Sequence, residues 1–572
     1  MPKHPHALTA LAGVCIVACT QVPSGEPSTH AGKQVNDHDS DGDSGPRDST
    51  AASDSSVQVD SGDGGDSGAA AWRSALYPDD WTPEFTFADG HFLHDFSYAG
   101  YHAGGSDIPS APGPHFDVVA YGADPTGAAD STAGISAAIA AASAAAPAVV
   151  EFPAGTFRLD GSISITRAGV VLHGQGSGVT RIYFTSLSGL SDGAHITFRG
   201  AITDGADYPL VTDGASRSRD VQIAPNSALK VGDAVSVGWT ITQAFVDEHA
   251  MAGVWVSFNG EYRRFFRRTI TAANTATGAV SLDVPLRYSA KVRDGASLRI
   301  DTGYLTECGI ENLSVSDVND WDAAWAETRN HAILFSGVQD CWARDITSWE
   351  SPLSVDGRGR HLASGGIEVL DSRRVTVADS VLEKPQNRGD GGNGYLFEVS
   401  RSNEILFRDD HANRGRHNFI QNWDFGTSGC VWLRTTSEGG RAYSSEDDAA
   451  GYASYSEFHH SLAMANLIDA SVASDGWQGV NRQAESSGAG HSATESVWWN
   501  ISGGGYLRSL QFGNGYIIGT DQMSVHVDPD EADWNNSGQG TAPTDWTEGI
   551  DQAPLLDPQS LYEDQLRRRL AR

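Results

Sequence analysis

The sequence predicts an all-β solenoid, which is a stack of coils built from short strands. Short apolar runs (VVEF, TFRL, SISI, VVLH and RIYF) follow one another between residues 149 and 184, with only a few turn residues between them. Similar runs return after residue 303 at intervals of about 25 to 34 residues. Glycine is abundant, at 64 of 572 residues, and charged residues make up only 20%, a composition that suits many tight turns.

A single helix precedes this series of strands. Residues 116–121 (FDVVAY) predict a strand, and the following GADPTG is a turn signal. Asp130 or Ser131 is placed to cap an Ala-rich helix that we expect to run from about Ser131 to Ala145.

Four stretches in this region resemble the entry coils of the pectate lyase superfamily. They are DVVAYGAD (117–124), DST (130–132), FPAGTF (152–157) and LHGQG (172–176). The resemblance covers residues 115 to 190 and extends to polygalacturonase-related and rhamnogalacturonase-epimerase-like proteins. It implies a right-handed parallel β-helix whose first coil is capped by the helix. It implies no particular chemistry, because this superfamily includes lyases, hydrolases, epimerases and phage tail spikes.

Changes in composition divide the chain into seven segments. Residues 203–300 alternate like antiparallel hairpins and predict a small inserted β subdomain. The expected order is a lipoprotein signal peptide (1–19), a disordered linker (20–70), an N-terminal extension (71–114), the first coils (115–202), the inserted subdomain (203–300), the main coils (301–525), and a C-terminal tail with a helix covering the end of the solenoid (526–572).

The first 19 residues predict export and attachment to lipid. Their apolar run is too short to span a bilayer, and it ends in Ile-Val-Ala-Cys, which resembles a bacterial lipobox. Cys19 would then be the first mature residue and would carry the lipid. The alternative is an ordinary signal peptide with an incidental cysteine. We expect an exported protein, held by lipid at the outer membrane or cell surface.

The cysteines of the main body predict buried thiols. Cys308, Cys341 and Cys430 each lie inside an apolar, strand-like run. A disulfide between Cys308 and Cys341 is the alternative, because an exported protein meets an oxidising compartment.

Four polar residues fall at equivalent positions of the repeat. Aligning CGIENLSVSD, CWARDITSWE, VTVADSVLEK and ILFRDDHANR brings Asn312, Asp345, Asp379 and Asp409 together. Equivalent positions of a parallel solenoid stack about 4.8 Å apart. The alignment therefore predicts a polar ladder, in which Asp409 would have a structural role.

Basic residues gather between 384 and 441, although the whole chain has a net charge of -34. Stacking of successive coils would place five of them on one face, namely Lys384, Arg388, Arg416, His417 and Arg434. A positively charged groove of this kind would bind a glycan that carries uronate or sulfate groups.

The chemistry that we expect at this groove is β-elimination. It requires a cation that neutralises the uronate carboxylate and a base that removes the proton at C5. Arg414 and Arg416 are the candidate neutralisers, and His417 or Lys384 is the candidate base. Calcium is the one cofactor that this chemistry leaves open. In the alternative interpretation the arginines form surface salt bridges with nearby aspartates, namely Asp409, Asp410 and Asp424.

Hydrolysis by paired carboxylates is the competing mechanism. Asp409 with Asp410, or with Asp390, would supply the pair. Only Asp409-Asp410 matches the polygalacturonase arrangement, and the calcium-binding aspartates of pectate lyases are not found. The resemblance therefore carries neither active site over to this chain.

A second dense segment, residues 457–500, supplies candidate sugar-binding residues. Trp477 and Arg482 suit a sugar platform, and a Gly-rich turn would present His491. Arg388 and Arg434 complete the substrate-binding candidates. A zinc site made of His459, Asp469 and His491 is a weaker alternative, and no metal ligands are assigned.

The leading hypothesis is a surface-anchored lyase that cleaves an anionic polysaccharide. A glycoside hydrolase and a non-catalytic glycan-binding or adhesive solenoid are the alternatives. The sequence contains no phosphate loop, serine elbow or dinucleotide fingerprint. An acidic exported chain without a basic stripe does not predict binding to nucleic acid. The oligomeric state stays open.

Overall fold

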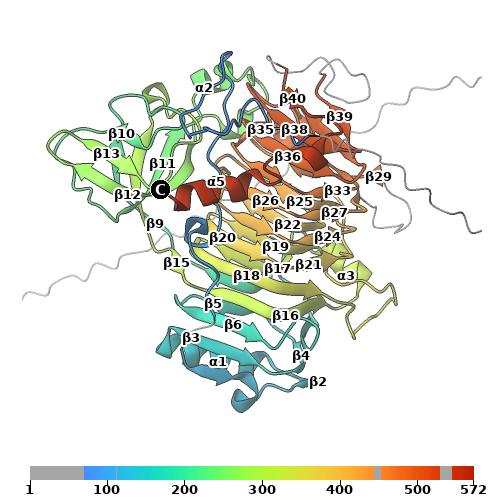
Figure 1. The fold of residues 1–572 in the computed structure, drawn as a ribbon. Coiled ribbons are helices and arrows are strands. Elements are labelled where there is room, and N and C mark those ends of the chain that lie inside the picture. Colours follow the sequence, from blue (N-terminus) through green and yellow to red (C-terminus); the bar gives the residue numbers. More distant parts are fainter. Residues whose placement is uncertain (1–69, 111–112, 443–451, 529–543) are drawn as a thin grey trace, which may run out of the picture. The chain divides into compact units, whose positions relative to one another are not determined.

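The computed structural model describes residues 70–110, 113–442, 452–528 and 544–572. The predicted signal peptide, Cys19 and nearly all of the linker lie outside the described residues. Most of the described chain consists of strands in long parallel sheets, which confirms the predicted all-β, right-handed parallel β-helix (Figure 1).

The larger parallel sheet has twenty strands and forms two adjoining walls of the solenoid. Long strands such as β16 and β18 run through both walls and pair with separate short strands on each side. Its strands are β1 (His115–Asp117), β2 (Thr126–Asp130), β3 (Ala148–Phe152), β4 (Gly155–Leu159), β6 (Val170–Gly174), β7 (Thr180–Phe184), β15 (Leu305–Thr306), β16 (Gly309–Asp317), β18 (Val338–Ser348), β20 (Arg373–Ala378), β21 (Val381–Glu383), β23 (Leu406–Arg408), β24 (His411–Asn413), β26 (Val431–Leu433), β27 (Thr436–Glu438), β32 (Leu467–Asp469), β33 (Val472–Ala473), β36 (Val497–Ser502), β38 (Tyr516–Asp521) and β40 (Trp546–Glu548).

A second parallel sheet of ten strands forms the remaining wall, and it positions the candidate site described below. Each of its strands pairs with the corresponding strand of the next coil. The strands are β5 (Ile163–Ile165), β8 (Ala194–Arg199), β17 (His331–Ser336), β19 (Gly365–Leu370), β22 (Tyr395–Ser400), β25 (His417–Gln421), β30 (Ser456–Phe458), β34 (Gly476–Gly479), β37 (Tyr506–Ser509) and β39 (Ser524–His526).

The apolar core fills the space between these walls. Inward-facing aromatic residues stack from coil to coil: the ring centroids of Phe397 and Phe419 lie 5.0 Å apart, and those of Phe419 and Trp477 lie 6.3 Å apart. All three side chains are buried. Burial of a large apolar side chain contributes roughly 1.5–3 kcal/mol, so this repeated stacking fixes the register of the coils.

The polar ladder predicted from the repeat is confirmed as a backbone corner. The strand register places Asn312, Asp345, Asp379 and Asp409 between the same pairs of strands in successive coils. Their φ angles are 60°, 51°, 54° and 58°, which is the left-handed region. Asn and Asp tolerate this conformation better than most other residues, and this explains their recurrence at the corner.

The predicted helix is present as α1 (Thr132–Ala145), with the Asp130 carboxylate accepting from the Thr132 amide at 2.9 Å. Its apolar face packs with the first strands, and Ile135 and Ala138 belong to the main core. Figure 1 shows α1 at the end of the stack formed by the earliest strands.

Residues 203–302 leave the coils and form a six-stranded antiparallel sheet in the order β10-β13-β12-β11-β14-β9. The segment that we call the inserted subdomain has its own apolar cluster, which Phe425, Leu462 and Met464 of the coils join. Its elements are β9 (Thr203–Pro209), β10 (Asp220–Gln222), β11 (Ala234–Thr240), α2 (Gln243–Glu248), β12 (Tyr262–Asn274), β13 (Ala279–Leu282) and β14 (Ser297–Thr302).

The sequence predicts that the C-terminal helix covers the open end of the solenoid, and this prediction is wrong for α5 (Leu561–Leu570). It lies on the outer face of the larger sheet, where Leu561 and Tyr562 share an apolar cluster with the N-terminal extension. The buried carboxylate of Asp469 on β32 accepts from the Leu561 and Tyr562 amides at 3.2 and 2.8 Å. These two hydrogen bonds satisfy backbone N–H groups in the first turn of α5 and hold the helix against the side of the coils.

The three cysteines of the described chain are free and buried, as predicted. The Cys308 amide donates to the Cys341 sulfur at 3.4 Å, so neighbouring coils stack these thiols without joining them. The remaining described elements are short. The helices are α3 (Trp321–Ala326), α4 (Glu485–Gly488), η1 (Tyr101–Gly104), η2 (Val118–Tyr121), η3 (Val256–Phe258), η4 (Val292–Asp294) and η5 (Ala553–Leu555), and the small ladders are β28 (Arg441–Ala442) with β29 (Tyr452–Ala453) and β31 (Ala463–Met464) with β35 (Ala493–Thr494).

Within the part of the chain that the structure describes, no helix combines the length and the apolar character needed to cross a membrane.

Candidate active site

Carboxylates form a column on the outer face of the ten-stranded sheet. Parallel register pairs Glu368 with Glu398, and Glu457 with Gln478, along the same line of outward positions. These positions are nevertheless covered, since Glu398 is 0% and Glu457 is 1% exposed. Burial of an isolated charge is costly, so each carboxylate must have charged or hydrogen-bonding partners. Such a column is a candidate site.

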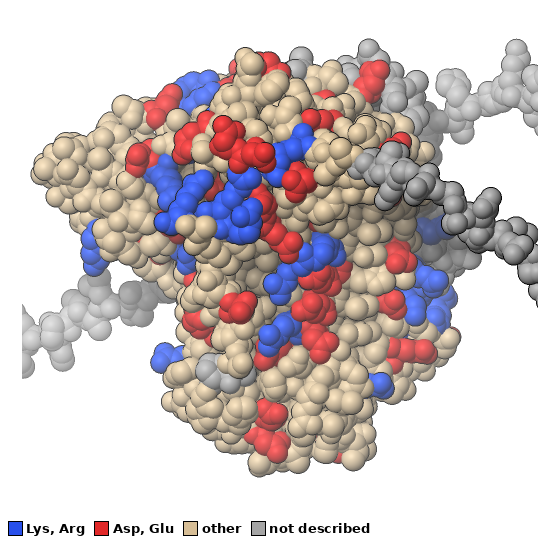
Figure 2. All heavy atoms as spheres, viewed as in Figure 1, with Lys and Arg blue, Asp and Glu red and all other residues tan. Residues whose placement is uncertain are grey.

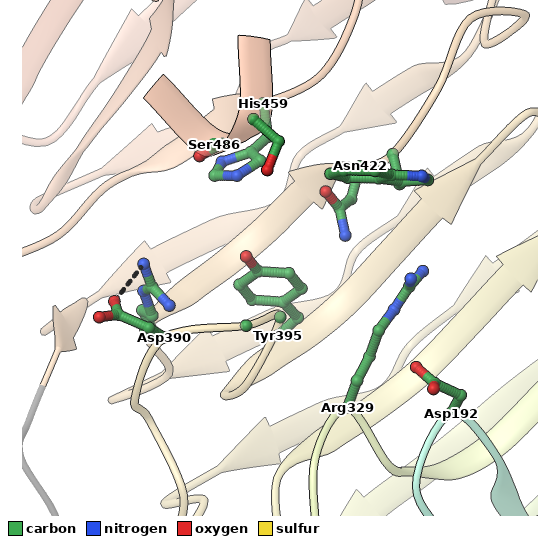
Figure 3. Close-up of a pocket in the computed structure, with 12 residues that line it drawn as sticks. Asp192, Arg329, Asp390, Tyr395, Asn422, His459 and Ser486 are labelled. Carbon is green, nitrogen blue, oxygen red and sulfur yellow. Dashed lines mark ion pairs between the residues drawn. The ribbon is translucent and has the colours of Figure 1, made fainter. Parts of the chain in front are cut away.

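A pocket of about 550 Å³ opens beside this column, and we call it the Tyr395 pocket. Figure 3 shows Arg329, Tyr395, Asn422 and His459 around one space, with Asp192 and Asp390 at its edges. The lining residues are Asp192, Arg329, Asp390, Gly391, Gly392, Tyr395, Arg416, Asn422, Trp423, His459, Ser486 and Ser487.

Several residues that line the pocket have a left-handed backbone. The φ angles are 58° at Asp192, 47° at Arg329, 34° at Trp423, 51° at Ser486 and 65° at Ser487. Residues other than glycine adopt this region at a cost of roughly 1–3 kcal/mol each, and such residues cluster at functional sites. The surrounding structure therefore holds the pocket wall in one particular shape.

His459 is the histidine that lines the pocket, and its ring is oriented by Glu457. Its Nδ1 contacts a carboxylate oxygen of Glu457 at short range. Arg482 Nη1 lies 2.7 Å from the same Nδ1 and donates to the His459 carbonyl at 3.2 Å. Burial lowers the pKa of His459 to about 3, so the imidazole is neutral at neutral pH.

Glu457 keeps its charge although it is buried. Burial alone would raise the pKa of this carboxyl, but His417, Arg482 and His459 together hold it well below its usual range. An ionised carboxylate only accepts hydrogen bonds and favours a proton on His459 Nδ1, whereas the Arg482 guanidinium can only donate and favours a lone pair on the same atom. A base that acts through Nε2 uses the tautomer with its proton on Nδ1. The lone pair is then on Nε2, as a general base requires.

His417 contacts the other side of the same carboxylate. Its Nδ1 donates to the Tyr455 carbonyl at 2.5 Å, and its Nε2 lies 3.3 Å from Glu457 Oε1. Burial lowers the pKa of His417 to about 4. His417 therefore supports the network beneath the pocket, and His459 is the histidine that faces the space.

Tyr395 supplies a hydroxyl that stays protonated. Its ring centroid lies 5.2 Å from that of His417 and 6.3 Å from that of His459. Burial raises the pKa of Tyr395 to about 12. Its phenol is therefore a proton donor across the neutral range. The separation of the Tyr395 and His459 rings is about the width of one sugar ring.

A second network adjoins the first at Arg329. The Arg329 Nη2 atom lies 3.2 Å from Glu398 and 3.3 Å from Glu368. His331 Nε2 lies 2.9 Å from Glu398, and the Asn422 amide donates to Glu398 at 2.9 Å. Burial would raise the pKa of Glu398, but the His331 hydrogen bond and the Arg329 charge lower it to about 2. For Glu368, burial and the neighbouring Glu398 charge raise the pKa instead.

Two groups of side chains at this site are close enough to hold a cation. They are His417, Glu457 and His459, and His331, Glu368 and Glu398; in each group the possible ligand atoms lie within 4.8 Å of one another. Each group contains histidine, whereas calcium prefers oxygen ligands. Arg482 and Arg329 already bring positive charge to these carboxylates. The geometry therefore gives no support to the calcium that the sequence left open.

Five of the residues named from sequence meet at the pocket, and two of them, Asp390 and His459, line it. Arg416 also lines it, His417 lies beneath it, and Arg482 contacts His459. Arg416 Nη2 is 3.3 Å from the exposed carboxylate of Asp390, the ion pair drawn in Figure 3. Arg388 is buried beside Arg416 and donates to the Arg414 carbonyl at 3.3 Å.

The remaining catalytic candidates lie on other walls. Asp409 is a corner residue whose carboxylate binds Arg434 at 2.6 and 2.9 Å, and Arg434 also binds Glu563 of α5 at 2.6 Å. Figure 2 shows basic and acidic side chains interleaved over the face that carries α5, so this face is not a positively charged groove. The predicted grouping of Arg434 with Arg416 is therefore corrected.

Asp410 cannot act with Asp409 as a catalytic pair. Its carboxyl is buried and accepts from the Ser380 and Arg408 amides at 3.0 and 3.1 Å. Burial raises the pKa of Asp410 well above its usual range. Lys384 and Arg414 occupy another left-handed corner, with φ of 52° and 62°, and neither lines the Tyr395 pocket.

Trp477 and His491 are structural in this molecule. Trp477 is 1% exposed and belongs to the main core, so its ring is not a sugar platform. His491 is buried, and its Nε2 lies 3.1 Å from the His249 carbonyl of the inserted subdomain. Asp469 binds the start of α5 on the larger sheet, so the alternative zinc set does not come together.

Several residues of the site were missed from sequence, among them Arg329, Tyr395, Asn422, Glu398 and Glu457. Tyr395, Glu398 and Glu457 belong to strands β22 and β30, whose inward positions carry the apolar signal. An alignment of β19 with β22 by register would have stacked Glu368 on Glu398, because both follow an apolar residue of the core. Trp423 also lines the pocket and was missed, although it follows Asn422 directly.

The fold defines the chain as a right-handed parallel β-helix protein. Residues 115–213 match the family described as rhamnogalacturonase A/epimerase, pectate lyase-like, which confirms the resemblance seen in the sequence. No curated protein sequence matches the chain.

Among solved structures, the chain is similar to the tailspike protein gp49 from Pseudomonas phage LKA1. The identity is 12% and the TM-score 0.47, over 72% of this chain and 64% of that one, which is less than two thirds of the tailspike chain. It is also similar to the A-module of Azotobacter vinelandii mannuronan C-5 epimerase AlgE4, with 12% identity and a TM-score of 0.30 over 76% and 95% of the two chains. A third similar structure is iota-carrageenase complexed to iota-carrageenan fragments, with 9% identity and a TM-score of 0.31 over 75% and 60%.

Proposed function

We propose that the protein acts on a polysaccharide and that it cleaves an acidic glycan by β-elimination at the Tyr395 pocket. One observation carries the proposal: two guanidinium groups, an amide, a neutral imidazole and a protonated phenol line the same space. These are the groups that elimination from a uronate requires. The family match at residues 115–213 supports a carbohydrate as the substrate.

Arg329, Arg416 and Asn422 would bind the uronate carboxylate. Among the residues that the structure describes, the ion-pair partner of Arg416 is the highly exposed Asp390, and a substrate carboxylate can replace this partner. Neutralisation of the carboxylate acidifies the proton at C5 and stabilises the charge that develops when this proton leaves.

His459 and Tyr395 would move the protons. His459 Nε2 removes the C5 proton, and the electron pair forms the C4–C5 double bond while the C4–O glycosidic bond breaks. The Tyr395 hydroxyl donates its proton to the departing oxygen, and the protons of base and acid are later exchanged with solvent. The products are a chain with an unsaturated, ultraviolet-absorbing end and a chain with a new reducing end.

Hydrolysis remains a second candidate, now with Glu368 and Glu398 instead of aspartates. Their environments shift the two pKa values in opposite directions, as a general acid and an ionised carboxylate require. All four side chains are largely buried, but Tyr395 and His459 line the pocket, whereas Glu368 and Glu398 are paired with Arg329 and are not among its lining residues. This access favours elimination.

A panel of polysaccharides tests the proposal: polygalacturonate, alginate, hyaluronan, chondroitin sulfate and a neutral glucan. The full chain is incubated with each, and ultraviolet absorbance is followed together with reducing ends. β-Elimination predicts that both signals rise together on at least one acidic polymer. Reducing ends without absorbance would support the glutamate pair. Binding without either signal would support a non-catalytic adhesive solenoid.

We also propose that the protein is exported and anchored through Cys19. The lipobox-like run and the acidic, Ser-rich and Gly-rich linker after it support this location. A surface position would bring the pocket to extracellular polysaccharides.

A further inference from the structure

The inserted subdomain reaches one wall of the Tyr395 pocket. The wall is the short helix α4, which carries Ser486 and Ser487, both with a left-handed backbone. No strand pairing of the ten-stranded sheet includes these residues, so the sheet alone does not fix them. Their positions depend on what α4 packs against.

Close contacts join α4 to the segment after α2. The Trp255 indole N–H donates to the Ala489 carbonyl at 3.0 Å, and both groups are buried. A Cβ added at Gly490 would lie 2.3 Å from Trp255 Nε1, and one at Gly488 would lie 2.1 Å from the Val254 carbonyl oxygen. Contacts this close leave no space between the inserted subdomain and the back of the wall.

The opposite side of the pocket also depends on the inserted subdomain. The Phe258 ring lies 6.2 Å from that of Trp423 and 5.3 Å from that of His460. His460 Nε2 lies 3.1 Å from the Ser486 carbonyl. Arg263 of β12 binds Asp424 at 2.7 Å, directly after Trp423. The same subdomain therefore contacts the residues on two sides of the space.

The inserted subdomain is not arranged as a mobile lid. Phe245 and Trp255 belong to one apolar cluster with Phe425, Leu462 and Met464 of the coils. Separating the two parts would expose these buried side chains, at a cost of roughly 1.5–3 kcal/mol for each large one.

We infer that the inserted subdomain forms a fixed wall of the Tyr395 pocket and that Trp255 positions Ser486 and Ser487 as part of a sugar subsite. The hydroxyls of this wall suit the hydroxyls of a neutral part of the glycan, next to the acidic sugar held by Arg329 and Arg416. The substrate would thus be an oligosaccharide that extends past the acidic unit. The sugar subsite, which is read out by KM, rests on the proposed function, whereas the positioning of Ser486 and Ser487 by Trp255 does not.

Trp255→Phe tests the inference, because it removes the indole N–H and keeps an aromatic ring. Trp239→Phe is the matched control: Trp239 is equally buried in the inserted subdomain, stacks on Phe265 at 3.6 Å, and its indole N–H has no hydrogen-bond partner among the described residues. Gly488→Ala is a second variant that disturbs the contact from the wall side. Hydrogen–deuterium exchange of residues 481–491 and steady-state kinetics are measured for all three full-length variants.

Trp255→Phe and Gly488→Ala are expected to raise exchange at residues 481–491, and Trp239→Phe is expected not to. On the panel polymer that the wild type cleaves fastest, KM should rise about fivefold while kcat stays within about twofold, since the wall binds substrate without touching the reacting atoms. Unchanged exchange in both variants would overturn the inference. Raised exchange with unchanged KM would show that the wall is not part of a sugar subsite. If the wild type cleaves none of the polymers, the proposed function fails, while exchange still decides whether Trp255 positions the wall.

Discussion

His417 and His459 share the carboxylate of Glu457, and their other contacts distinguish their roles. The Nδ1 proton of His417 is held by the Tyr455 carbonyl and its Nε2 faces the buried carboxylate, so both nitrogens are occupied. The Nδ1 of His459 contacts the carboxylate, and this residue lines the pocket. The residue that can accept a proton from a substrate is therefore His459, whereas the sequence favoured His417.

Removal of the Tyr395 hydroxyl tests the proposed acid. Tyr395→Phe should lower kcat by about 100- to 10,000-fold, the usual contribution of a positioned acid or base, and leave KM within a few-fold. Tyr506→Phe serves as the control, because Tyr506 is 43% exposed on β37 and does not line the pocket. Equal activities of the two variants would exclude Tyr395 as the acid.

The pH dependence of kcat/KM tests the proposed base. Burial lowers the pKa of His459 to about 3, below its value in an unfolded chain, so its basic form is present above pH 3 and is lost only as the pH falls through that value. We expect no acidic limb between pH 5 and pH 8, where an ordinary histidine would titrate at about 6.5. An acidic limb at about 6.5 that disappears in His459→Gln would show a base with an unshifted pKa.

At the scale of the strand and the corner, the sequence predicted more of the scaffold than of the site. The ladder from Asn312 to Asp409 could be read from the repeat, because the left-handed corner selects Asn and Asp. The carboxylate column could not be predicted from the repeat, because Glu398 and Glu457 alternate with apolar residues of the core. The two glutamates come together only through the register of separate coils. The sequence predicted that the basic residues near 414 form one group, but the corners and strands of the coils place their side chains on different walls.

Asp409→Asn tests the assignment of Asp409 to the ladder, because it removes the charge and keeps a side chain that tolerates the left-handed corner. Its partner Arg434 is 39% exposed, so the pair is expected to contribute less than about 1 kcal/mol to the free energy of unfolding. Urea unfolding should therefore shift little, and cleavage should be unchanged. A loss of activity of more than about tenfold at wild-type stability would return Asp409 to the catalytic machinery.

For the whole molecule, the N-terminal extension and α5 cover part of the outer face of the larger sheet, at strands β23, β26, β32, β36 and β38, and the inserted subdomain adjoins the Tyr395 pocket. The ten-stranded sheet keeps its outer face for the site. The class of fold followed from short runs and turns, but the insertion's contact with the pocket wall could not be predicted, because residues 255 and 489 are far apart in sequence.

The anchor is tested on the intact chain in a bacterial host. Cys19→Ala should abolish incorporation of radiolabelled palmitate and shift the protein from the membrane fraction to a soluble fraction, since a thioether-linked lipid requires the cysteine thiol. Cys15→Ala is the matched control and should leave labelling intact. Labelling that survives in Cys19→Ala would contradict the lipobox assignment.

The source of the oxygen in the product tests the central claim most directly. Wild-type protein cleaves its acidic polymer in water enriched in the heavy oxygen isotope, and mass spectrometry follows the first products formed, before the anomeric oxygens at their reducing ends exchange with water. β-Elimination breaks the C4–O bond without adding water, so the unsaturated product should contain no solvent oxygen, and the glutamate variants Glu368→Gln and Glu398→Gln should not alter this pattern. One heavy oxygen incorporated per cleavage would mean hydrolysis and would contradict the account.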